Sequence, residues 1–87
     1  MHSAAAVDNA ALVADFVASL ATRSLNTRSA YSRDVGALCE LAGDLPLASM
    51  TRARLARGLA TLHGRGLSGR SLARMLSAWR AFFRHLL

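Results

Sequence analysis

The sequence predicts an all-α protein, a compact domain of four helices, on three observations. Its 87 residues can bury one modest core, so we expect a single domain. Alanine, leucine and arginine, all strong helix formers, are its most frequent residues, and there is only one proline. No stretch alternates apolar and polar residues as a half-buried strand does. Apolar residues instead recur every three or four positions, which is typical of helices that bury one side.

The first half of the chain contains two expected helices. Residues 1–7 are interpreted as a flexible lead-in to a domain of residues 8–87, and Asp8 is expected to cap a helix that runs to about Thr22. A second helix ends at Gly43. Its candidate caps are Ser24, Asn26 and Thr27. The buried stripes of the two helices are expected to be Leu12, Val13, Phe16, Val17 and Leu20, and Tyr31, Val35, Leu38, Cys39 and Ala42.

The second half repeats this organisation. Residues 43–50 hold the only proline and are expected to form a connector, after which Thr51 caps a third helix. Glycines at positions 64 and 66 end it, and Ser68 caps a fourth helix with the clearest amphipathic pattern in the chain. Because its aromatic residues share a stripe with leucines and a methionine, we expect them to pack in the core instead of stacking on bases. The inward residues are Leu55, Leu59 and Leu62 in the third helix, and Leu72, Met75, Leu76, Trp79, Phe82, Phe83 and Leu86 in the fourth.

The charge is strongly polarised along the chain. The formal net charge is +6, and all eleven basic residues are arginines. None of them precedes Arg23, and no acidic residue follows Asp44. Such a distribution favours a polyanionic partner, with nucleic acid the first choice and an anionic membrane surface the second.

Several functional classes lack the residues that they need. Cys39 is the only cysteine, and the three histidines are scattered without ligand spacing, so we expect no disulfide, no metal site and no cofactor. No serine lies in a nucleophile motif, so we expect no catalytic residue. The N-terminus lacks the basic start of a signal peptide, and no run approaches the roughly 20 apolar residues of a membrane span. We therefore expect a soluble, cytoplasmic protein.

Two helix faces are candidates for contact with an anionic partner. The polar side of the fourth helix lies opposite its apolar stripe. An ordinary solvated face is the competing interpretation. In the second helix, Gly36 indicates either close approach of a partner or simple tolerance of glycine, and tolerance is favoured. The residues concerned are Arg70, Arg74, Ser77 and Arg84 in the fourth helix, and Asn26, Thr27, Ser29, Arg33 and Gly36 in the second.

Two segments resemble a known family. The tract 66–83, GLSGRSLARMLSAWRAFF, is similar to the last helix of the N-terminal core-binding domain of tyrosine recombinases, the phage-integrase family. The segment 24–35, SLNTRSAYSRDV, resembles the second helix of that domain, in which a Thr, a Tyr, an Arg and an Asp recur at this spacing. The matching residues are Thr27, Tyr31, Arg33 and Asp34. Within the family, the pieces Ser71-Leu-Ala and Leu76-Ser-Ala favour the XerC branch over XerD.

This resemblance implies a SAM-like four-helix fold that forms one half of a clamp around duplex DNA, with the second and fourth helices at the major groove. The function implied is to grip a recombination half-site, for chromosome dimer resolution or DNA integration, beside a second recombinase subunit. By position, the implied DNA-facing residues are Asn26, Thr27, Ser29, Arg33, Arg70, Ser71, Arg74, Ser77 and Arg80.

The resemblance also implies that catalysis lies elsewhere. In the family, a separate C-terminal domain carries an arginine, a lysine, a His-x-x-Arg motif and a tyrosine nucleophile. His63 begins His-Gly-Arg-Gly, which ends in glycine, and Tyr31 lies in the binding domain. We therefore expect no enzyme activity from this chain, which we interpret as part of a longer recombinase. The alternatives are a helical module that docks on an acidic protein and an amphipathic binder of membrane surfaces.

Overall fold

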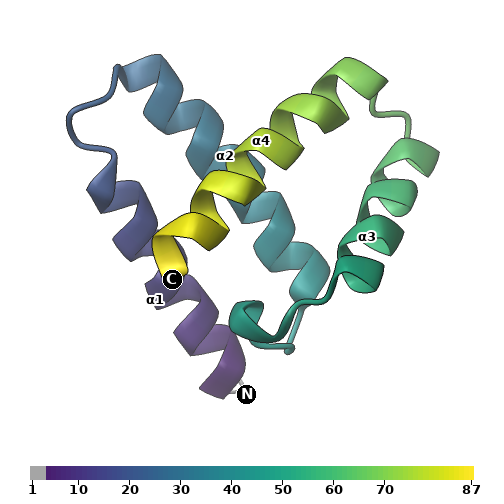
Figure 1. The fold of residues 1–87 in the computed structure, drawn as a ribbon, viewed down its shortest axis with the longest axis horizontal. Helices are drawn as coiled ribbons and strands as arrows, with labels where there is room; N and C mark the ends of the chain where they lie inside the picture. The colour runs from purple at the N-terminus through teal and green to yellow at the C-terminus, as the bar shows by residue number, and fades with distance from the viewer. Residues whose placement is uncertain (1–3) are drawn as a thin grey trace.

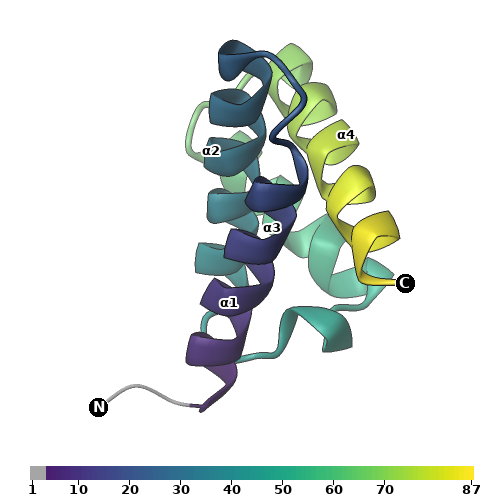
Figure 2. The ribbon, with the colours of Figure 1, turned by 90° about the vertical axis from the view of Figure 1, so that its left-hand side faces the viewer.

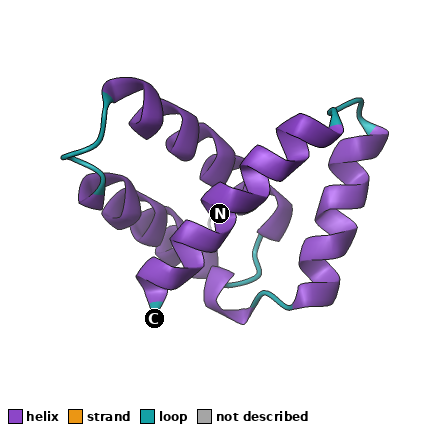
Figure 3. Cartoon of the chain, turned by 45° about the horizontal axis from the view of Figure 1, so that its top comes forward, coloured by secondary structure: helices purple, strands orange, loops and turns teal. Residues whose placement is uncertain are grey.

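The computed structural model describes residues 4–87, with side chains from residue 8 onward. Within this range there are four α-helices, one 3-10 turn and no strand, which confirms the predicted all-α class. Figure 3 shows the helices joined by loops. The elements are α1 (Ala4–Ser19), α2 (Leu25–Ala42), the 3-10 turn η1 (Leu47–Ser49), α3 (Arg52–Gly64) and α4 (Gly69–Leu86).

The helices form two hairpins. In Figure 1, α1 and α2 make one hairpin and α3 and α4 the other, and α4 crosses α2 near the middle of both helices. Figure 2 shows α1 running alongside α2, with α4 to one side of them. The N-terminal halves of α2 and α4 therefore diverge from the point where the two helices cross. Contacts near that point join the two hairpins.

Three helices begin at the predicted caps. Ser24, Thr51 and Ser68 each have extended backbone, and each side-chain oxygen accepts a hydrogen bond from the N–H three residues later, at 3.1 to 3.2 Å. These bonds satisfy N–H groups that have no partner inside the helix. At the other end of α2, Gly43 adopts a φ of 58° and donates its N–H to the carbonyl of Cys39, which closes the helix as predicted.

The predicted bounds of the first helix are wrong at both ends. It begins at Ala4, so Asp8 lies inside the helix and does not cap it. Three consecutive alanines precede Val7, and their high helix propensity explains the earlier start. The helix ends at Ser19, and the residues up to Thr22 form a turn. Residues 1–3 of the expected lead-in lie outside the described residues.

The core joins all four helices. Phe16 lies at its centre, with its ring edge-on to Phe82 at 5.4 Å between centroids and stacked on Tyr31 at 6.2 Å. The aromatic residues of α4 therefore pack in the core, as predicted. The placement of Cys39 is wrong: it is only partly buried and borders a groove between α1 and α2. The buried apolar residues are Phe16, Leu20, Val35, Leu38, Leu47, Leu62, Met75, Ala78, Trp79 and Phe82.

Candidate nucleic-acid interface

The outer side of α4 is basic and open. Arg70, Arg80 and Arg84 are exposed and form no side-chain hydrogen bond or ion pair with the described residues, so their charges are available to a partner. Met75, Trp79 and Phe82 lie on the opposite side of the same helix and are buried. This division follows from the helical period, which brings every third or fourth side chain to one face. The amphipathic pattern thus fixes which way the arginines of α4 point.

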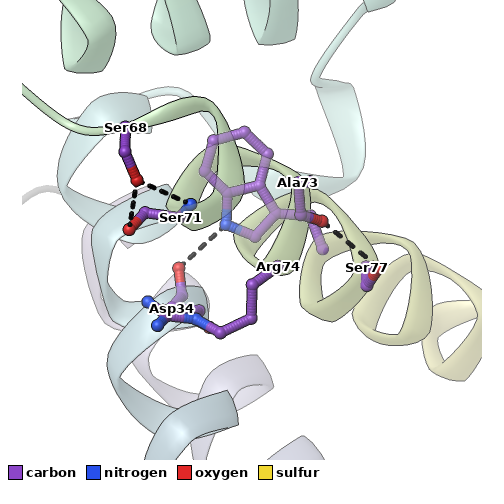
Figure 4. A network of polar contacts seen from close by, with 7 residues as sticks. Asp34, Ser68, Ser71, Ala73, Arg74 and Ser77 are labelled. Carbon is purple, nitrogen blue, oxygen red and sulfur yellow. Dashed lines mark hydrogen bonds and ion pairs between the residues drawn. The ribbon is translucent and has the colours of Figure 1, made fainter.

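Arg74 lies at the boundary between these two sides. Its side chain is 51% exposed, whereas that of Asp34 on α2 is 1% exposed. The Nε–H of Arg74 donates to Oδ2 of Asp34 at 3.2 Å, and Nη2 donates to Oδ1 at 3.1 Å, so the guanidinium and the carboxylate meet along one edge. Figure 4 shows the Arg74 side chain reaching Asp34. A charged acid buried to this extent needs such a partner. The pair therefore joins α2 to α4 at their crossing.

Trp79 of α4 also forms a hydrogen bond with Asp34. Its indole Nε1–H donates to the backbone carbonyl of Asp34 at 2.8 Å, and the Trp79 side chain is itself buried. A hydrogen bond to a helix-interior carbonyl adds to the one that the helix already makes, because a carbonyl oxygen has two lone pairs. Asp34 is thus fixed by α4 through both its side chain and its main chain.

Two further candidates take part in the starts of their helices. Ser24 Oγ donates to Thr27 Oγ1 at 2.9 Å, and Ser68 Oγ donates to Ser71 Oγ at 3.1 Å. Thr27 and Ser71 occupy the third position of α2 and α4, respectively, and both are partly buried. The hydroxyls of Thr27 and Ser71 accept these bonds, so each can donate its own hydrogen to a further acceptor. The two helices therefore present the same arrangement at their N-termini, where unpaired N–H groups and the helix dipole favour anions.

The other candidates on α2 spread around the helix. Asn26 is exposed beside the N-terminus of α2. Ser29 and Arg33 are exposed and line a shallow pocket with Val17 and other residues of α1. Arg28 borders the same pocket, and its Nε is buried without a hydrogen-bond partner. The candidates of α4 thus lie together, whereas those of α2 reach over to α1.

Ser77 completes the exposed side of α4. Its hydroxyl donates to the carbonyl of Ala73 at 3.3 Å, one turn back along the helix, so the side chain lies flat against α4. Ala73 and Ser77 are both exposed and small. They leave the backbone of α4 open to close approach between Arg70 and Arg80.

Other arginines belong to a different surface. Arg54 and Arg57 of α3 line a pocket with Leu41, Leu45 and Met50, beyond the C-terminal end of α2. This pocket lies at the C-terminal end of α2, away from the N-terminal half of that helix. Arg54 and Arg57 therefore serve as internal controls for any effect that depends on charge alone.

Asp34 matches the family's second-helix pattern, but it was not among the residues expected to face DNA. It lies between Tyr31 and Leu38 at the helical spacing of the buried stripe, and it is the only acid on that stripe. An acid in such a place requires a cation from another helix. That requirement is the signal in the sequence by which the pair with Arg74 could have been found.

Residues 4–87 contain neither a metal-binding cluster nor a membrane-spanning helix. No group of three or more His, Cys, Asp or Glu residues lies close enough to hold a metal ion within this part of the chain. None of its helices has the length and apolarity needed to cross a membrane.

Comparison with known proteins identifies the domain. The chain is 43% identical over 67 residues to tyrosine recombinase XerC of Chromobacterium violaceum, a match that covers 77% of this chain and 22% of that relative. It is 46% identical over 67 residues to XerC of Azotobacter vinelandii, covering 74% and 22%, and 42% identical over 65 residues to XerC of Ralstonia pickettii, covering 70% and 20%. The chain thus spans about a fifth of the length of these relatives. No solved structure matches it.

A family model assigns the chain to the same group of proteins, and it matches more of the chain than these relatives do. The model described as phage integrase, N-terminal SAM-like domain, matches residues 13–87, which takes in the C-terminal part of α1 and all of the other helices. The resemblance inferred from two short segments is confirmed over nearly the whole described fold. The chain belongs to the phage integrase N-terminal SAM-like domain family.

Proposed function

We propose that this chain is the DNA-binding domain of a site-specific tyrosine recombinase of the XerC type, and that it grips one half-site of a recombination target through α2 and α4. The observation that carries the proposal is the basic outer side of α4. There Arg70, Arg80 and Arg84 are exposed, and α4 is held against the buried core by the opposite side of the same helix. An α-helix presented in this way fits the major groove of B-DNA.

The charges suit the phosphate backbone. Arg33 on α2 adds a further exposed cation, and the N-termini of α2 and α4 add hydrogen-bond donors. Contacts of this kind fix the orientation of a protein on a duplex without reading its sequence. Affinity for any duplex is therefore expected to depend strongly on salt.

The chain spans only part of its relatives' length, and this bears on which step of recombination it performs. Those proteins bear the name tyrosine recombinase, and this chain corresponds to about a fifth of their length. Strand exchange in such a protein is then the work of residues outside this chain, acting beside a second recombinase subunit on the other half-site. This chain supplies DNA binding and orientation.

Titration of the chain with a fluorescent duplex at several salt concentrations tests the proposal. If three or four phosphates are neutralised, a plot of log K against log salt has a slope of about −3. A parallel NMR titration should shift amide signals of α2 and α4 and leave those of α3 in place. Shifts confined to α3, or no binding at low salt, would refute the assignment.

Two control titrations separate this function from the alternatives. A polyglutamate peptide replaces the duplex to represent an acidic protein partner, and vesicles with anionic lipid represent a membrane surface. Tighter binding to the peptide than to DNA would favour a protein-docking module, and binding to vesicles alone would favour the membrane surface.

A further inference from the structure

Arg74 differs from the other exposed arginines of α4 because a buried acid holds it. Arginine has five N–H donors, and the pair with Asp34 uses the Nε–H and one hydrogen of Nη2. The two hydrogens of Nη1 and the second hydrogen of Nη2 are left, and one hydrogen of each nitrogen points in the same direction at the far edge of the planar guanidinium. That free edge is a two-pronged donor, and the side chain that carries it is 51% exposed.

The direction of this edge is fixed by packed groups. Asp34 is 1% exposed, and the indole of Trp79 donates to its main-chain carbonyl at 2.8 Å. A free arginine on a helix surface samples many rotamers and loses this freedom when it binds. Arg74 has already lost much of it on folding. It is therefore preorganised for a target of defined geometry.

The pair is close to neutral in charge. Arg70 and Arg80 are unpaired within the described residues and carry full charges toward a polyanion, whereas the carboxylate of Asp34 offsets the charge of Arg74. Attraction to phosphate depends on net charge, but a bidentate hydrogen bond to the O6 and N7 atoms of guanine depends on the position of two donors. The structure thus suits Arg74 to a base edge better than to a phosphate.

The surroundings of Arg74 allow a base to come close. Ala73 and Ser77 are small, and the Ser77 side chain is folded back onto α4. Arg70 lies one turn before Arg74 on the same exposed side, where it can hold the backbone that flanks the base. Side-chain bulk therefore does not shield the free edge of Arg74.

We propose that Arg74 reads a guanine through O6 and N7 in the major groove, and that Asp34 is the positioning residue that aims it. This inference rests on the proposed DNA binding and adds its specificity. Arg74 then contributes to the choice of sequence, whereas Arg70, Arg80 and Arg33 contribute to affinity for any duplex.

The experiment begins with selection of bound duplexes from a random-sequence pool by the unaltered chain. Selection should fix a guanine at one position or more. Each fixed guanine is then replaced by 7-deazaguanine, which lacks the N7 acceptor, and the loss of affinity is measured. At the position that Arg74 reads, the loss should be on the order of tenfold or more.

Two variants assign this loss to the pair. Arg74→Lys keeps the charge but lacks the planar fork, so it should bind the unmodified and the 7-deazaguanine duplexes equally while the salt slope stays unchanged. Asp34→Asn should also lose the discrimination. Because it removes a negative charge, it should bind random duplexes more tightly than the unaltered chain, whereas a variant that is merely unstable would bind every duplex less.

A destabilised control separates aim from stability. Asn9→Ala removes hydrogen bonds between α1 and the connector, away from the pair, and it should keep the discrimination at temperatures where it is folded. If Asp34→Asn does not fold, Arg74→Lys alone decides. No selected sequence despite salt-dependent binding, or full 7-deazaguanine discrimination in Arg74→Lys, would overturn the inference and leave the proposed DNA binding intact. Absence of any DNA binding would overturn both.

Discussion

Asn9 and Leu47 are joined by a buried hydrogen bond of 2.8 Å from the Leu47 backbone N–H to the side-chain Oδ1 of Asn9. The amide nitrogen of Asn9 donates to the carbonyl of Leu45 at 2.9 Å, so one side chain bonds two backbone groups of the connector after α2. Asn9 and Leu47 are both fully buried. The connector is thus hydrogen-bonded to α1 through Asn9, and it contributes Leu47 to the core.

Replacement of Asn9 by alanine should therefore lower the stability of the fold. A buried N–H and a partly buried carbonyl would lose their partners, and each unsatisfied group costs about 1 to 3 kcal/mol. We expect a loss of about 2 kcal/mol or more in the free energy of unfolding, measured by urea denaturation. Asn26→Ala removes an exposed asparagine in α2 and should change stability by less than about 0.5 kcal/mol. Equal effects of the two variants would contradict the importance of the connector bonds.

Two helical glycines provide a matched test of packing. A Cβ added at Gly36 would meet nothing within 4 Å, whereas one added at Gly58 would meet Leu41 Cδ1 at 2.9 Å. Alanine is favoured over glycine inside a helix by roughly 1 kcal/mol. Gly36→Ala should therefore raise the free energy of unfolding by up to about that amount, and Gly58→Ala should gain less or lose stability because Leu41 must move. Thermal denaturation of both variants measures the difference, and a larger gain at position 58 would refute it.

The sequence predicted most of the fold because its local signals agree with its packing. The caps at Ser24, Thr51 and Ser68 and the stop at Gly43 are decided within a few residues, so they are visible without a structure. The first helix escaped prediction at its start because a chain of alanines can extend a helix beyond a good capping residue. The burial of Asn9 escaped it as well, since its partners lie 36 and 38 residues away.

The candidate site was predictable to a smaller extent. The exposed arginines of α4 follow from helical periodicity, and the structure places them where expected. The link between Arg74 and Asp34 depends on how α2 and α4 cross, and periodicity within one helix says nothing about crossing. Contact of Asn26, Thr27, Ser29, Arg33, Arg70, Ser71, Arg74, Ser77 and Arg80 with DNA stays a prediction.

The pair between Asp34 and Arg74 should be visible in a double-mutant cycle. Arg74→Ala leaves a buried carboxylate without its partner, and we expect a loss of about 2 kcal/mol, reduced from the fully buried case because the arginine is half exposed. In the Asp34→Asn background the same substitution should cost much less. Urea denaturation of the four proteins gives the coupling energy, which should lie between about 0.5 and 3 kcal/mol. A coupling of zero would mean that the two side chains act independently.

The arginines of α4 and α3 should differ in their effect on DNA binding even though each substitution removes one charge. Arg70→Ala and Arg80→Ala should each weaken binding to a random duplex and reduce the magnitude of the salt slope by about one, because each removes one phosphate contact. Arg57→Ala should leave the slope unchanged, since Arg57 borders the pocket beyond the end of α2. None of the three side chains pairs with a described residue, so the variants should be equally stable, and circular dichroism on heating checks that they are. Equal losses of affinity at positions 57, 70 and 80 would show that the duplex responds to total charge alone, and α4 would then have no special place in the interface.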